Sequence, residues 1–301
     1  MFFTTAALSL GCLAVASARP MPRASAPTDA DILNFALTLE HLENTFYSEA
    51  LAKYSSQDFI NAGLPVWAYG RFKEISEHEA AHVQFLSTAL GAQATQPCTY
   101  SFPYTDPLSF VSLSRALEGV GTSAYIGAST FIQNKDYLLA AATVLSTEAR
   151  HSTWADSAVR HSAGWSGPYD TPLDLNQVYT IASAFITSCP ESNPKLPVSA
   201  FPALSFSANP TPGQTADLTY TPPDGVDASV PLFVAFLSGQ SAVFVALTDS
   251  KKVAIPSDLR GTVYALISTD GSAVNDNTTI AGPAVLDFSY NSNGDVIQLP
   301  F

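Results

Sequence analysis

Two Glu-x-x-His quartets constrain this chain more than any other feature. The first runs from Glu79 to His82 and the second from Glu148 to His151. On an α-helix, residues three apart lie on the same face, so each quartet directs a carboxylate and an imidazole to one point. Each quartet follows a further glutamate on a separate helical stretch. This order is expected of a four-helix bundle that holds two metal ions in its core.

The helical stretches around the quartets repeat. Glu40 is followed seven residues later by Tyr47, and Glu118 is followed seven residues later by Tyr125. Seven residues make almost two helical turns, so each tyrosine lies on the face of its own glutamate, roughly 10 Å along the axis. Two helix hairpins related by a pseudo-twofold axis would bring both half-sites face to face.

The stretch LNFALTLEHLENTFYSEAL, residues 33–51, and the paired quartets resemble the ferritin-like superfamily, which includes rubrerythrins and manganese catalases. The similarity is greatest to a fungal and plant group of secreted stress-response, late-sexual-development and desiccation-related proteins, and it covers about residues 29–190. It implies six metal ligands and two tyrosines that support them. These are Glu40, Glu79, His82, Glu118, Glu148 and His151, with Tyr47 and Tyr125.

Glu43 is a second candidate on the first helix. It lies one turn beyond Glu40 on nearly the same face, so either residue could be the ligand. The repeat register with Glu118 favours Glu40. Glu43 and Asp156 are candidates to orient a ligand histidine through its second ring nitrogen.

Four carboxylates and two imidazoles suit Fe or Mn. Their charge of −4 would be balanced by two divalent ions, which removes the repulsion among the carboxylates. The resemblance implies O₂ or peroxide as the substrate, in ferrous oxidation, peroxide reduction or peroxide disproportionation. The alternative is a non-enzymatic extracellular protein with a vestigial metal site, whose second domain adheres to cell-wall or matrix polysaccharide.

The first 18 residues predict a secreted protein. An apolar run ends in Ala16-Ser17-Ala18, as in a cleaved signal peptide, and residues 19–28 would form a flexible mature terminus. In an oxidising compartment the two remaining cysteines, Cys98 and Cys189, favour one disulfide over two free thiols. Asn277 lies in a glycosylation sequon.

Composition argues against two classes of partner. The net charge of −13 repels phosphate backbones and anionic lipid, so we expect no binding to nucleic acid. No stretch is long and apolar enough to predict membrane insertion. Hydrophobic residues make up 47% of the chain, which is enough to form the cores of two domains.

The pattern of hydrophobic residues and prolines changes near Pro190. Helical periodicity before it predicts a four-helix bundle with a fifth helix over residues 29–190, the fifth helix running from Thr171-Pro172 to Cys189-Pro190. Short apolar runs between prolines after it predict an antiparallel, immunoglobulin-like β-sandwich over residues 191–301. We expect an α+β protein in which residues 28–190 fold alone. The six runs expected to form strands are residues 204–207, 217–220, 232–237, 242–247, 262–267 and 285–290.

Overall fold

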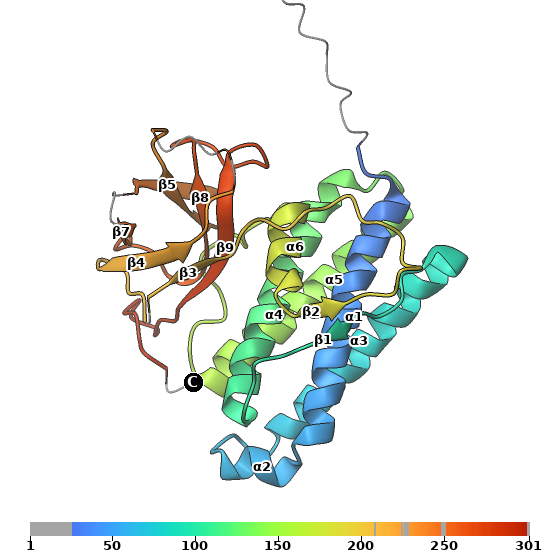
Figure 1. Ribbon diagram of the computed structural model, residues 1–301. Coiled ribbons are helices and arrows are strands. Elements are labelled where there is room, and N and C mark those ends of the chain that lie inside the picture. Colours follow the sequence, from blue (N-terminus) through green and yellow to red (C-terminus); the bar gives the residue numbers. More distant parts are fainter. Residues whose placement is uncertain (1–25, 208, 224, 226–228, 248–250, 300–301) are drawn as a thin grey trace, which may run out of the picture.

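The computed structural model describes residues 26–207, 209–223, 225, 229–247 and 251–299. A helical bundle is followed by antiparallel sheets (Figure 1), which confirms the α+β architecture predicted from the sequence. The predicted signal peptide at residues 1–18 lies outside the described residues, as do residues 19–25 of the predicted flexible terminus.

The bundle consists of two helix hairpins. In the first, α1 packs against α3, and in the second, α4 packs against α5. The short helix α2 (Ser56–Asn61) occupies the connection inside the first hairpin. The four long helices are α1 (Asp29–Lys53), α3 (Ala68–Leu90), α4 (Pro107–Ala128) and α5 (Lys135–Trp154).

Side chains at the helix starts define where these helices begin. The Thr28 hydroxyl accepts a hydrogen bond from the Asp31 N–H, and the Asp31 carboxylate accepts one from the Thr28 N–H, which forms a capping box for α1. Asp106 caps α4 in the same way, with Pro107 at the first helical position. The start predicted for α4 from this Asp-Pro pair is therefore confirmed.

The fifth helix is shorter than the sequence predicts. Helix α6 (Leu175–Ser183) begins after Asp174, whose carboxylate accepts a hydrogen bond from the Gln177 N–H at 2.8 Å. Thr171 does not cap it, because its hydroxyl accepts a hydrogen bond from the Gly239 N–H of the sheet region. After α5 the chain continues in a π-helical segment, Ala155–Arg160.

A disulfide joins the two strands of a small sheet on the bundle at one end of the sheet. Strands β1 (Thr99–Tyr100) and β2 (Ile186–Ser188) pair antiparallel, and the Cys98–Cys189 bond lies beside them. The predicted disulfide is therefore present. Because it closes a loop with a sequence separation of 91, chain entropy predicts a stabilisation of roughly 4–5 kcal/mol.

The C-terminal part contains two antiparallel sheets that share a hydrophobic core. The six predicted runs all form strands within the described residues, with ends shifted by a few residues, and β7 is an additional strand. The first sheet contains, in order, β3 (Leu204–Phe206), β4 (Thr215–Tyr220) and β7 (Lys252–Ala254). The second contains β6 (Ser241–Ala246), β5 (Phe233–Ser238), β8 (Gly261–Ser268) and β9 (Thr279–Phe288).

Strand β8 is buried on both faces because it contributes to two cores. Val263, Ala265 and Ile267 pack inside the sheets, while Tyr264 points the other way and packs into the core of the bundle. Helix α6 and strand β9 lie side by side where the two parts meet (Figure 1). The bundle and the sheets therefore form a continuous buried interface.

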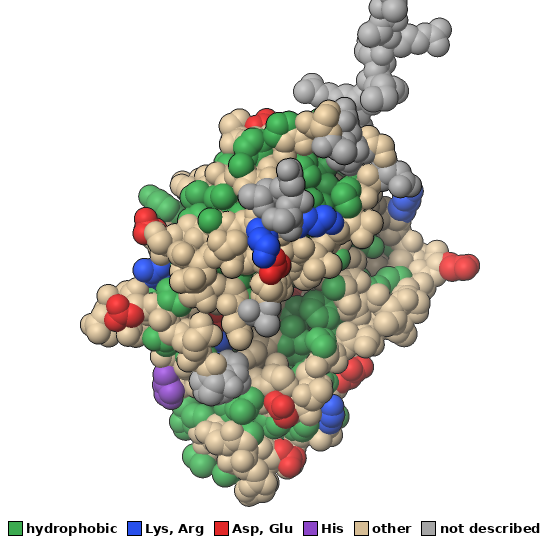
Figure 2. All heavy atoms as spheres, turned by 60° about the vertical axis from the view of Figure 1, so that its left-hand side comes forward, with side chains coloured by type: hydrophobic (Ala, Val, Ile, Leu, Met, Phe, Trp, Pro, Cys, Tyr) green, Lys and Arg blue, Asp and Glu red, His purple; other side chains and the backbone are tan. Residues whose placement is uncertain are grey.

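Charged side chains are sparse on the surface. Figure 2 shows one face on which they are scattered between larger hydrophobic and uncharged areas. Among the helices of the described part of the chain, none is long and apolar enough to cross a membrane.

Candidate metal centre

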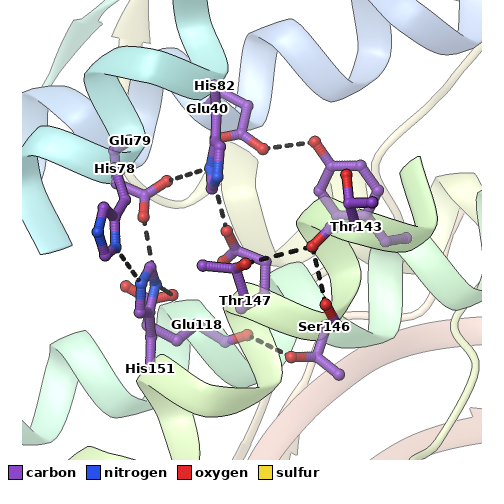
Figure 3. Close-up of polar contacts among 12 residues, drawn as sticks. Glu40, His78, Glu79, His82, Glu118, Thr143, Ser146, Thr147 and His151 are labelled. Atoms are coloured by element: carbon purple, nitrogen blue, oxygen red, sulfur yellow. Dashed lines mark hydrogen bonds and ion pairs between the residues drawn. The ribbon is translucent and has the colours of Figure 1, made fainter. Parts of the chain in front are cut away.

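The six residues predicted as ligands meet in the middle of the bundle. Helix α1 contributes Glu40, α3 contributes Glu79 and His82, α4 contributes Glu118, and α5 contributes Glu148 and His151. Figure 3 shows labelled members of this group pointing toward one another between the helices. The four glutamates are completely buried.

His82 lies at the centre of the first half-site. Its Nδ1 atom is 3.2 Å from Oε2 of Glu40 and 3.1 Å from Oε2 of Glu79. The same nitrogen is 3.3 Å from Oε1 of Glu148. One imidazole thus faces three carboxylates from three helices.

His151 lies at the centre of the second half-site. Its Nδ1 atom is 3.0 Å from Oε2 of Glu118 and 3.3 Å from Oε1 of Glu79. Within each half-site, the potential ligand atoms lie within 4.8 Å of one another, and Glu79 and Glu148 belong to both. These two carboxylates therefore lie between the half-sites, where they could bridge two ions.

The carboxylate oxygens of this centre fit a bound metal. Oε1 of Glu79 and both side-chain oxygens of Glu148 are buried and accept no hydrogen bond within the described residues. A buried carboxylate is costly unless it is protonated, paired or bound to a cation. The oxygen and imidazole donors suit Fe or Mn, and their arrangement gives each of two ions its own histidine.

Protons compensate the charge of the metal-free centre. Burial raises the pKa of Glu40 to about 7 and, with the charges of Glu79 and Glu118, raises that of Glu148 well above its usual value. Hydrogen bonds to carboxylates outweigh burial and raise the pKa of His82 to about 10 and that of His151 to about 9. Incoming metal ions must displace these protons.

Each tyrosine supports the glutamate of the opposite hairpin. The hydroxyl of Tyr125 donates to Oε1 of Glu40, and that of Tyr47 donates to Oε1 of Glu118. Ser114 forms a further hydrogen bond with the Tyr47 hydroxyl at 2.7 Å. In both glutamates the other oxygen faces a histidine, so the tyrosines orient these carboxylates toward the centre.

The spacing of residues along the helix did not predict the contact of His78 with His151. The Nδ1 atom of His78 is 2.9 Å from Nε2 of His151, and the two rings stack with centroids 5.2 Å apart. The helical periodicity of α3 places His78 away from the ligand face. Its side chain nevertheless extends to the neighbouring helix α5 and contacts His151 there. Asp156, which was predicted as a partner of a ligand histidine, instead pairs with Arg115 and Arg160.

Glu43 lies beside the centre but outside both half-sites. It is buried, and burial followed by the charges of Glu118, Glu79 and Glu40 raises its pKa well above the usual value. Gly121 lies between Glu43 and Glu148: a Cβ atom there would be 3.2 Å from Oε1 of Glu43 and 3.1 Å from Oε2 of Glu148. The geometry groups Glu40 with the other ligand atoms and does not include Glu43.

The comparisons with known proteins agree with this architecture. Residues 28–161 match the ferritin-like domain family. The helical region that this match covers is therefore ferritin-like. A curated relative, protein rds1 of Schizosaccharomyces pombe (strain 972 / ATCC 24843), is 27% identical over 189 residues, which cover 60% of this chain. The match spans 45% of that relative's length, somewhat less than half.

Proposed function

We propose that this protein is secreted, binds two Fe or Mn ions, and reacts with O₂ or peroxide during stress or development. The observation that carries the proposal is the pair of shared carboxylates, Glu79 and Glu148. Oε1 of Glu79 and both side-chain oxygens of Glu148 are buried and accept no hydrogen bond within the described residues. The disulfide between Cys98 and Cys189 supports an oxidising compartment.

Each half-site supplies its own ligands. Glu40 and His82 would hold one ion, Glu118 and His151 would hold the other, and Glu79 and Glu148 would contact both. Bound Fe or Mn would supply the redox chemistry that no side chain of the centre supplies. His78 is exposed and hydrogen-bonded to Nε2 of His151, so it provides a route for protons between solvent and that ring.

Metal stoichiometry tests the proposal directly. The full-length chain is depleted of metal, reloaded with Fe(II) or Mn(II), and analysed for bound metal. We expect two ions per chain, and loss of both in the variant Glu79→Ala/Glu148→Ala. The variant Glu77→Ala is the matched control, because Glu77 is an exposed glutamate on the same helix. Full metal retention in the double variant would contradict the assignment.

A second assay separates an enzyme from a scaffold. Ferrous oxidation and peroxide consumption are measured with each metal-loaded form, and the control variant should match the unmodified chain. Turnover that is lost with Glu79→Ala/Glu148→Ala supports the oxidoreductase. Two tightly bound ions without turnover would instead favour the structural or adhesive extracellular role.

A further inference from the structure

A polar cavity of about 170 Å³ lies between the helical bundle and the sheets. Its walls are α4, α5, strand β8 and the loop of residues 161–174. Gly119, Ala149 and Ser152 form part of the wall, and each directly follows a predicted ligand in the chain. The cavity therefore lies behind the second half-site and is separate from it.

The loop over this cavity is held on both sides. On the sheet side, the Thr262 N–H donates to Oγ of Ser166 at 2.8 Å, and the Tyr290 hydroxyl donates to the Trp165 carbonyl at 2.9 Å. On the bundle side, the Thr153 hydroxyl donates to the Gly164 carbonyl at 2.9 Å. Because the loop is already fixed, a ligand would lose little free energy in ordering it.

Hydroxyl groups dominate the lining, and aromatic rings stand at its rim. Trp165 and Tyr169 have 61% and 57% of their surface exposed, which is high for residues of this size. Aromatic rings of this kind offer an apolar face beside a polar edge. The hydroxyls include those of Thr122, Ser123, Ser152, Thr153, Thr262 and Tyr264.

The charges of the lining disfavour an anion. Arg115 is already paired with Asp156 at 2.8 Å and with Asp287 at 3.5 Å. Asp170 adds a carboxylate that has no hydrogen-bond partner within the described residues and lies near enough to Tyr264 to affect its pKa. The cavity thus presents a free acceptor but no uncompensated cation.

We propose that this cavity binds a neutral polyhydroxylated ligand, either a free monosaccharide or the terminal sugar of a glycan. At the roughly 30 Å³ that each water occupies in the liquid, the volume corresponds to five or six waters, which a single sugar ring would displace. The apolar face of that ring would stack on Trp165 or Tyr169. Its hydroxyls would bond to Asp170 and to the hydroxyls of the wall.

Ligand titration of the full-length chain tests this proposal. A panel of hexoses and N-acetylhexosamines is screened by saturation-transfer NMR and tryptophan fluorescence, and the polysaccharides built from them are screened by co-sedimentation. Binding of the free sugars indicates a small-molecule site. Retention of the polymer alone indicates recognition of a chain end. Failure of every sugar and polymer to bind would overturn the proposal.

Three variants locate the site. Trp165→Ala removes a rim ring, Asp170→Asn removes the free carboxylate without changing its size, and Thr262→Phe fills the cavity from β8. Each should weaken binding at least tenfold while the far-UV circular dichroism spectrum and the melting temperature stay close to those of the unmodified chain. Trp67→Ala is the matched control, because Trp67 is an exposed tryptophan at a different place on the bundle. Binding that survives Asp170→Asn and either of the other two variants would place the ligand elsewhere and overturn the proposal.

Discussion

The hydroxyl of Tyr125 on α4 donates a hydrogen bond of 2.5 Å to Oε1 of Glu40 on α1. In the same way, the hydroxyl of Tyr47 on α1 donates a hydrogen bond to Oε1 of Glu118 on α4. Each hairpin of the bundle thus orients a carboxylate of the other. The two half-sites are therefore interdependent, and neither hairpin alone contains a complete set of supporting contacts.

Removing one tyrosine hydroxyl should weaken metal binding at both half-sites. Tyr125→Phe keeps the ring but leaves Oε1 of Glu40 without its donor, and loss of such a supporting contact lowers metal affinity about 10–100-fold. Competition titration with a chelator measures the change. Tyr69→Phe is the control, because the Tyr69 hydroxyl donates to the Leu51 carbonyl and not to the centre. Equal affinities in the two variants would show that the Tyr125 contact does not support binding.

The stability of the metal-free protein should fall as pH rises. Burial raises the folded-state pKa of Glu40 to about 7, and carboxylates raise those of His82 and His151 to about 10 and 9. A group with a raised folded-state pKa stabilises fully below its unfolded value, and this contribution is lost as pH rises through the folded value. We therefore expect a decline in the melting temperature from about pH 5 to pH 10.

Metal loading should remove most of this dependence, because bound cations replace the protons. Thermal melts of metal-free and metal-loaded protein across the same pH range measure the difference, which should widen with pH. In Glu148→Gln, which cannot titrate at this position, the metal-free protein should lose part of its slope. Parallel melting curves for the metal-free and metal-loaded forms would rule out the proton-for-metal exchange.

Helix periodicity explains why so much of the centre could be predicted. A spacing of three residues puts Glu79 and His82 on one face whatever the neighbouring helices do, and the same holds for Glu148 and His151. Contacts between helices depend on how far one helix is shifted along another, and one sequence does not determine that shift. For this reason the spacing argument placed each tyrosine with its own glutamate and missed the contact of His78 with His151.

Among the described residues, the strands that the sequence did not predict are β1, β2 and β7, and each has two or three residues. Strand β7 has three residues and pairs with the edge of β4, too short a run to show alternation. The long runs that became β5 and β8 carry enough buried residues to be recognised from composition. Contacts between the sheets and the bundle, such as that of Tyr264, leave no local signal in the sequence.

Asp287 of β9 should stabilise the whole chain. It lies 2.7 Å from Nη2 of Arg160 and 3.5 Å from Nη2 of Arg115, and both arginine side chains are nearly buried. Asp287→Asn removes the negative charge that faces both arginines, and among the described residues Asp156 is the acid that still pairs with both. Breaking a fully buried ion pair costs about 3–5 kcal/mol, and we expect roughly 2–3 kcal/mol here because the Asp287 side chain is 29% exposed.

Urea denaturation measures this loss. Asp217→Asn is the matched control, because Asp217 pairs with Lys252 at 2.8 Å on the surface, where both side chains are more than half exposed. Exposed pairs contribute little, so the control should change stability by less than about 1 kcal/mol. Equal effects of the two substitutions would show that the buried position of the Asp287 pair does not matter.

Truncation after Glu191 tests whether the bundle folds alone. Sequence texture predicts that residues 28–190 are independent, whereas the contacts of Asp287 and Tyr264 predict that the fragment is destabilised. We expect a lower melting temperature and less bound metal than in the full chain. Arg160→Leu in the fragment leaves Arg115 paired with Asp156 and should restore part of the stability. Circular dichroism and metal analysis of the fragment distinguish these two expectations. A fragment with the melting temperature of the full chain would support an independently folding domain.

Gly121 has no side-chain atom that could bind a metal, yet it limits the space available to the centre. Glu43 and Glu148 come so close to its Cα that even a methyl group would touch both. A larger residue there would act as a wedge between two acids while leaving every potential ligand in place. The protein could therefore lose its capacity for metal through a change at a position that a survey of donor residues would pass over.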